Sequence, residues 1–197
     1  MKILYILIIL FFLIMAGCSK QSEQVEQEAG LQPESSPEIQ DTKIVYDAAL
    51  QGNIQTVQSY LDKGFDVNKR DADKRSLPML AGFNGHTELC RLLLGKGAEI
   101  DARDFNGRTA LMFASTGPFA ETVRFLLESG ADPNVVDQGE HFTALMHAAA
   151  EGQMEVVQVL LEHGADKTVK DVDGDTAESF ARQKGHLSVA DYLRDYN

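Results

Sequence analysis

The feature of this sequence that most constrains its fold is a repeat with a period of 33 residues. Four glycines, each of which follows an apolar stretch, are separated by 33, 33 and 34 residues: Gly64, Gly97, Gly130 and Gly164. Four aspartates recur at the same intervals: Asp71, Asp104, Asp137 and Asp171. In a chain with this period each repeat forms one supersecondary unit, and the units bury their apolar faces by stacking. The sequence therefore predicts a linear array.

Each repeat is predicted to contain two helices followed by a turn. Thr109 and Thr143 can cap the first helix of a repeat through their hydroxyl groups, and Ser76 and Thr176 stand at equivalent positions. The second helix carries apolar residues at helical spacing, as in "VVQVLLEHG", and the glycine that follows suits a left-handed cap. The segments "DARDFNGR" and "KDVDGD" supply Asn, Asp and Gly for a tight turn. A hairpin-like finger is therefore expected to link one repeat to the next.

The recurring segments "YLDKGFDVN", "LLLGKGAEID", "LLESGADPN" and "LLEHGADKT" resemble the ankyrin-repeat family. The resemblance implies an all-α solenoid of about five helix-turn-helix repeats with hairpin-like finger loops. The expected repeats are 43–71, 72–104, 105–137, 138–171 and 172–197. Repeats one, two, three and five depart from the family pattern, and two of these departures predict a local change in structure. Pro78 stands one place late, which predicts an irregular helix start, and Gly117-Pro118-Phe119 replaces Gly-His, which predicts an altered turn.

The N-terminus is predicted to be a lipoprotein signal peptide, residues 1–17. An apolar run without charge ends in Met15-Ala16-Gly17-Cys18, which resembles the lipobox of bacterial lipoproteins. The resemblance implies cleavage before Cys18 and acylation of its thiol. The alternative is an uncleaved N-terminal anchor helix.

Residues 18–42 are predicted to be a lipidated cysteine and a disordered acidic linker, because large apolar residues are almost absent. The chain carries a net charge of −12, and the folded part, without the signal peptide and linker, carries about −8. No cluster of Lys and Arg stands out, so nucleic acid is a poor candidate partner. Cys90 is expected to be a small buried hydrophobe, and no disulfide or metal site is indicated.

We found no arrangement of nucleophile, base or metal ligands and no phosphate-binding loop, so the chain is predicted not to be an enzyme and to need no cofactor. The resemblance implies a binding scaffold that contacts a protein through its concave face, with no small-molecule substrate. The partner-binding residues carried over from the family pattern are Leu80, Phe83, Phe105, Phe113, Phe142 and His147. The alternative for each ring is that it packs between repeats. His147 is either an interaction residue or a solvated one.

These observations together predict a protein–protein interaction scaffold on the bacterial cell envelope, with the lipid as its only contact with the membrane. Ser19 is not the aspartate that favours inner-membrane retention, so the outer membrane facing the periplasm is expected in a Gram-negative source. One alternative is a periplasmic immunity or protective protein that captures a toxin or enzyme. Another is a structural organiser of an envelope complex. An enzyme that depends on His147 is the most distant hypothesis.

The lipoprotein hypothesis makes a prediction about Cys18. Mass spectrometry of the membrane-extracted protein should show a mature chain that begins at an acylated cysteine. The Cys18→Ala variant should remain an unprocessed precursor, because the acylated thiol directs cleavage in this class. Normal cleavage and release of that variant as a soluble protein would contradict the hypothesis.

Overall fold

Helices alternate with turns throughout residues 37–196, the range that the computed structural model describes. The helices of this range are α2 (Pro37–Leu50), α3 (Ile54–Asp62), α4 (Leu77–Phe83), α5 (Thr87–Gly95), α6 (Ala110–Ala114), α7 (Ala120–Glu128), α8 (Ala144–Ala150), α9 (Met154–Glu162), α10 (Ala177–Gln183) and α11 (Leu187–Asp195). No strand occurs among the described residues. The prediction of an all-α array is confirmed.

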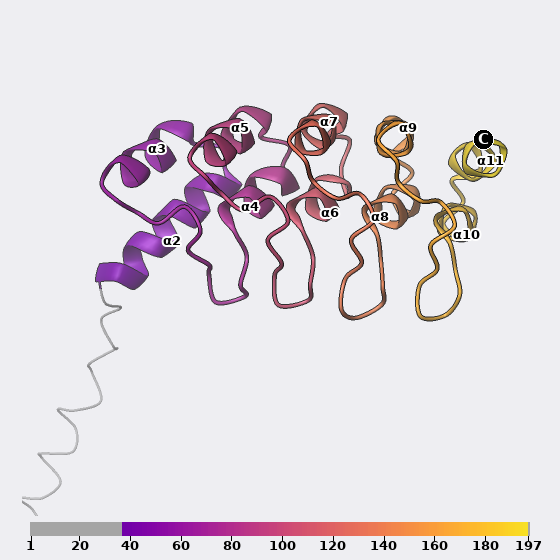
Figure 1. The fold of residues 1–197 in the computed structure, drawn as a ribbon, viewed down its shortest axis with the longest axis horizontal. Coiled ribbons are helices and arrows are strands. Elements are labelled where there is room, and N and C mark those ends of the chain that lie inside the picture. Colours follow the sequence, from indigo (N-terminus) through magenta and orange to yellow (C-terminus); the bar gives the residue numbers. More distant parts are fainter. Residues whose placement is uncertain (1–36, 197) are drawn as a thin grey trace, which may run out of the picture. The chain divides into compact units, whose positions relative to one another are not determined.

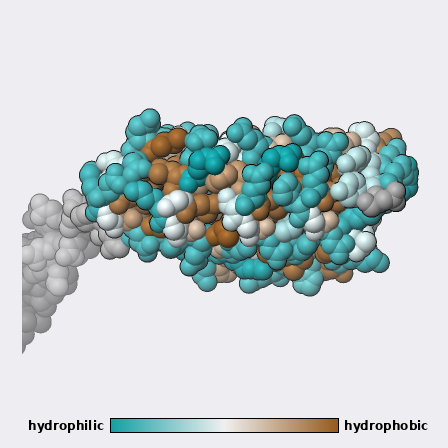
Figure 2. Space-filling model, turned by 45° about the horizontal axis from the view of Figure 1, so that its top comes forward, coloured by the Kyte–Doolittle hydropathy of each residue, from teal (hydrophilic) through white to brown (hydrophobic). Residues whose placement is uncertain are grey.

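Residues 41–197 form one unit, in which the helices stand in two rows (Figure 1). The outer row contains α3, α5, α7, α9 and α11, and the inner row contains α4, α6, α8 and α10. Four finger loops extend on the side of the inner row: residues 69–75, 102–108, 135–142 and 169–175. The outer row presents a largely hydrophilic surface, with apolar side chains visible between its helices (Figure 2). The inner helices and the fingers lie on the side of the array opposite the outer row.

Three of the four expected threonine and serine caps are present. Thr109, Thr143 and Thr176 each have extended backbone angles and accept a hydrogen bond from the third N–H of the helix, at 3.2–3.4 Å. Ser76 has the same extended backbone, but its buried hydroxyl has no hydrogen-bond partner. The helix after Ser76 is the one that contains Pro78. The start of this helix therefore has the usual backbone conformation but lacks the hydrogen bond from the capping side chain.

In the second and fourth repeats, the turn between the two helices needs glycine for two reasons, a positive φ and a close neighbouring ring. Gly85 has a φ of +71°, and a Cβ there would lie 2.2 Å from the ring of Phe119 in the next repeat. Gly152 has a φ of +70°, and a Cβ there would lie 2.5 Å from the His186 ring. Phe119 occupies the place of the expected histidine at the start of α7, and α6 has five residues where α4, α8 and α10 have seven. The predicted alteration of this turn is confirmed.

The repeated aspartates fix the shape of the fingers. Asp104 accepts hydrogen bonds from the backbone N–H groups of Asn106 at 2.9 Å and Arg108 at 2.8 Å. Asp71, Asp137 and Asp171 make equivalent bonds in the other fingers. The aspartates are turn formers, as the sequence predicts. Each finger is also joined to the next by one backbone hydrogen bond, such as the one that Phe105 donates to Asp73 at 3.0 Å.

One residue near the tip of every finger has a positive φ. In two fingers this residue is glycine, Gly107 at +80° and Gly174 at +88°. In the other two it is Lys74 at +59° and His141 at +61°. A residue with a Cβ is disfavoured in this region by roughly 1–2 kcal/mol, so Lys74 and His141 are locally strained. The backbone has a positive φ at this position in all four fingers, so its conformation does not explain why two of them carry a side chain there.

The buried apolar residues that the structure describes all lie between Val45 and Leu193. A chain of residues 37–197 therefore contains the whole described core and is expected to fold alone. Cys90 belongs to this core, and its burial raises the pKa of the thiol to about 12, so the prediction of a small buried hydrophobe is confirmed.

The N-terminal side of the array differs from the prediction in one place. Helix α2 begins at Pro37, six residues before the predicted domain boundary at Lys43. Proline suits the first turn of a helix, because its missing N–H would have no partner there. The predicted signal peptide, Cys18 and residues 18–36 of the predicted linker lie outside the described residues. None of the described helices is long and apolar enough to cross a membrane.

The stacked arrangement predicts that equal truncations cost different amounts at different positions. Leu126 in α7 is fully buried between neighbouring repeats, and Leu193 in α11 is buried in the last one. Leu126→Ala should lower the free energy of unfolding by about 2–5 kcal/mol. Leu193→Ala should lower it less, because the terminal repeat has one neighbour and can fray. Urea unfolding of both variants measures the difference, and equal losses would argue against a linear array.

Candidate binding surface

Three phenylalanines lie on the inner helices and the second finger of the second and third repeats, and we call them the aromatic patch: Phe83, Phe105 and Phe113. Phe83, at the end of α4, is 45% exposed and packs edge-to-face on Phe113 of α6, with ring centroids 6.2 Å apart. Phe105 is 69% exposed on the second finger. Its backbone bond to Asp73 ties that finger to the first one. Phe113 is half-buried and contacts the core, so it differs from the fully exposed ring that its position suggests.

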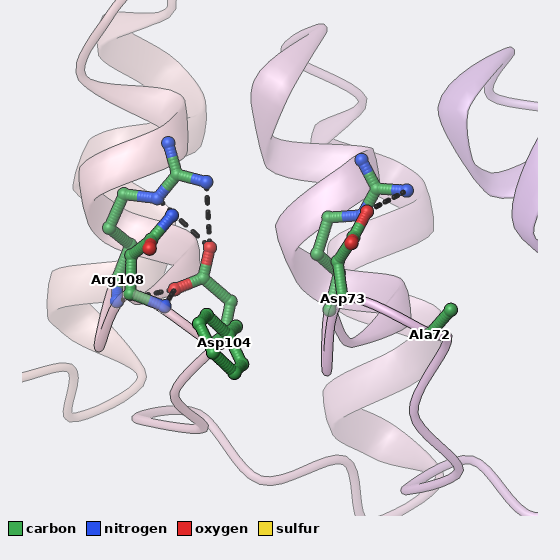
Figure 3. Close-up of a pocket in the computed structure, with 7 residues that line it drawn as sticks. Ala72, Asp73, Asp104 and Arg108 are labelled. Atoms are coloured by element: carbon green, nitrogen blue, oxygen red, sulfur yellow. Dashed lines mark hydrogen bonds and ion pairs between the residues drawn. The ribbon is translucent and has the colours of Figure 1, made fainter.

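Cationic side chains lie beside the aromatic patch. The Arg108 guanidinium is 4.6 Å from the centre of the Phe113 ring, and the Lys74 ammonium is 5.9 Å from the centre of Phe105. Both distances allow a favourable cation–π interaction. Between the first two fingers is a hollow of about 470 Å³, to which Arg75 and Arg108 both contribute (Figure 3). The surface therefore combines exposed rings with basic groups.

The arginines of this hollow are already paired with aspartates of their own fingers. Arg108 contacts the buried carboxylate of Asp104 at 2.8 Å (Figure 3), and Arg75 contacts Asp71 at 2.7 Å. A second contact joins Arg75 to Asp73 at 3.3 Å, but the Asp73 side chain is 69% exposed. An exposed ion pair of this kind contributes little, so Arg75 can exchange Asp73 for another acceptor. Lys74 contacts no carboxylate among the described residues.

The other predicted contact residues lie elsewhere. Phe142 and His147 are half-buried and pack against each other, with ring centroids 5.6 Å apart, and Phe142 also packs on Phe180 at 4.8 Å. Phe142 of the fourth repeat and Phe180 of the fifth both pack against the core. The structure therefore places five of the six predicted residues in two separate groups and not on one surface.

Leu80 requires a correction, because the prediction placed it on the exposed side of its helix. It is only 7% exposed and belongs to a core cluster with residues of α2, including Val45 and Ala49. The first repeat covers this part of α4, so the position that carries Phe113 one repeat later is enclosed here. Leu80 is a core residue and not part of the aromatic patch.

The last residue of a finger packs on a residue of the following inner helix in two successive repeats, but the residue types differ. Arg108 stacks on Phe113 in the third repeat, and Phe142 packs on His147 at the equivalent positions of the fourth. The buried Nε2 of His147 has no hydrogen-bond partner. Burial lowers the pKa of His147; nearby Asp137 and Glu151 oppose this effect, and Arg108 adds to it. No group of three or more His, Cys, Asp or Glu in the described part of the chain could hold a metal ion.

The basic residues of the surface were not among the residues predicted from the sequence. Two signals could have identified them. Arg75 and Arg108 are 33 residues apart, at the same place in their fingers. Lys74 occupies a position at which two other fingers have glycine. Aligning the repeats by their spacing is therefore enough to identify these basic residues from the sequence.

The family model for ankyrin repeats (three copies) matches residues 45–137 and residues 119–197. The two matches together span most of the chain, and the protein belongs to the ankyrin-repeat family. No curated protein matches the chain. Ankyrin repeats indicate a protein–protein interaction scaffold, and proteins of this family are generally non-catalytic.

The burial of His147 predicts a pH dependence of stability. A histidine whose pKa is lowered in the folded state resists protonation, whereas the unfolded chain takes up a proton near pH 6.5. Stability should therefore fall as the pH drops below about 6.5. In His147→Leu this contribution is absent, and an unpartnered buried nitrogen is removed. Urea unfolding between about pH 7.5 and 5 should show a smaller loss for the variant, and identical losses would contradict the assignment.

Proposed function

We propose that this protein is a lipid-anchored binding protein of the bacterial cell envelope, which holds a protein partner on the face formed by the inner helices and the fingers. Membership in the ankyrin-repeat family supports the general class. The aromatic patch supports the choice of face.

The observation that carries this proposal is the exposure of Phe83 and Phe105 on rigid supports. Phe105 is the most exposed of the large hydrophobic residues in the described chain, although its backbone is bonded to the neighbouring finger. Phe83 is fixed against Phe113. A ring on an ordered backbone costs little further backbone entropy on binding, and aromatic residues are frequent anchors of protein interfaces.

The cellular location rests on the first residues of the sequence. Met15-Ala16-Gly17-Cys18 matches the lipobox pattern in its small residues and cysteine, and acylation there would tether the chain to a membrane. The acidic, apolar-poor segment that follows would separate the array from the bilayer. In a Gram-negative source, Ser19 after the cysteine favours the outer membrane facing the periplasm. In this position the array would select partners among envelope proteins.

The test is capture of a partner from an envelope extract by immobilised residues 37–197. Phe105→Ala should melt as the parent does, because the ring is exposed, and should weaken capture about thirtyfold, which corresponds to roughly 2 kcal/mol. Phe113→Ala should weaken capture too, but with some loss of stability, because its ring contacts the core.

Leu187→Ala is the matched control, since Leu187 is 57% exposed on α11 of the outer row. It should capture the partner as the parent does. Parent-level capture by Phe105→Ala, or an equal loss in Leu187→Ala, would contradict the proposed face.

A further inference from the structure

The charges of the four fingers change sign along the array. The first finger, 69–75, holds four basic and two acidic residues, and the second, 102–108, holds two basic and one acidic. The third, 135–142, holds two acidic residues and no Lys or Arg, and the fourth, 169–175, holds three acidic residues and one basic. In a chain with a net charge of −12, the first two fingers are therefore a positive region.

The first two fingers can attract a negative group although the whole chain is negative, because dissolved salt screens the more distant charges. Packed helices are spaced by about 8–10 Å, and the Debye length at physiological ionic strength is about 8 Å. The acidic third and fourth fingers are one and two spacings from the second finger, and two and three from the first. A charged group bound beside the first two fingers therefore interacts mainly with the charges of those fingers, which carry a net charge of +3 although Arg75 and Arg108 are paired with aspartates.

Lys74 is the most informative residue of this region. Its φ of +59° is strained, and the equivalent residues of two other fingers are glycines. Strained side chains tend to persist where they serve a function. Its ammonium group lies over the exposed Phe105 ring and contacts no carboxylate among the described residues, so its charge is available to a ligand.

We infer that the partner binds the aromatic patch through an acidic segment, in which Asp or Glu residues flank an apolar side chain. The apolar side chain would pack on Phe105, the most exposed of the three rings. The flanking carboxylates would meet Lys74 and Arg75, and one of them would replace the exposed Asp73 at the Arg75 guanidinium. A basic segment is disfavoured, because it would meet like charges beside the rings. This inference rests on the proposed binding face and adds the chemistry of the partner.

The test uses a library of random twelve-residue peptides displayed on phage and selected on immobilised residues 37–197. The enriched peptides should carry Asp or Glu beside a large apolar residue. A synthetic copy of one such peptide, measured by fluorescence polarisation, should bind more weakly as salt is raised. Enrichment of neutral or basic peptides, or of none, would overturn the inference.

Two glycine substitutions provide a matched pair. Lys74→Gly and His141→Gly relieve the same backbone strain at equivalent positions, but only the first removes a cation from the positive region. Lys74→Gly should melt at or above the parent temperature and bind the enriched peptide at least about tenfold more weakly. His141→Gly should bind as the parent does, and Lys74→Arg should keep most of the affinity. Parent-level binding by Lys74→Gly, or an equal loss in His141→Gly, would overturn the inference.

The same variants separate this inference from the proposed function. If Lys74→Gly captures the envelope protein as the parent does and Phe105→Ala does not, the acidic segment is wrong and the binding face stands. If both variants capture it fully, the proposed face fails as well.

Discussion

The structure depends on one constraint: each repeat can cover its apolar surface only with the repeats next to it. The contacts that join repeats therefore recur at about the repeat length. Thr87 and Thr122 share a buried hydrogen bond of 2.7 Å, and Asn68 donates to the Gly97 carbonyl at 3.0 Å. The close fit of Phe119 on Gly85 shows how little space this stacking leaves. Any residue that served this packing poorly would disturb two repeats together.

The same constraint determines where binding residues can lie. Stacking encloses the sides of the helices that meet a neighbouring repeat, but it leaves the fingers and one edge of the inner helices uncovered. Aspartate bonds to the backbone hold the fingers in shape without help from the core, so their outward side chains are free to vary. Phe105 and Lys74 are examples: one is strongly exposed, and the other stands where glycine would be less strained. Stability and recognition thus use different residues of one repeat.

The sequence predicts most of the architecture, because helix caps, turn aspartates and cap glycines act locally and recur at a fixed spacing. It does not predict which side chains of the inner row are exposed. Leu80, Phe113 and His147 occupy equivalent positions, but Leu80 is enclosed by the first repeat and the other two are half-buried. Their exposure depends on the size of the residues around them in adjacent repeats. A contact such as that of Arg108 with Phe113 depends on the residue types at two positions, and neither position alone predicts it.

Hydrogen exchange of residues 37–197, with and without a captured envelope protein or an enriched peptide, tests the central claim most directly. If the ligand binds the uncovered face of the second and third repeats, protection should rise in the first two fingers and at the ends of α4 and α6. The outer helices α5, α7 and α9 should exchange as they do in the free chain. Protection confined to the outer row, with unchanged exchange in both fingers, would contradict this account.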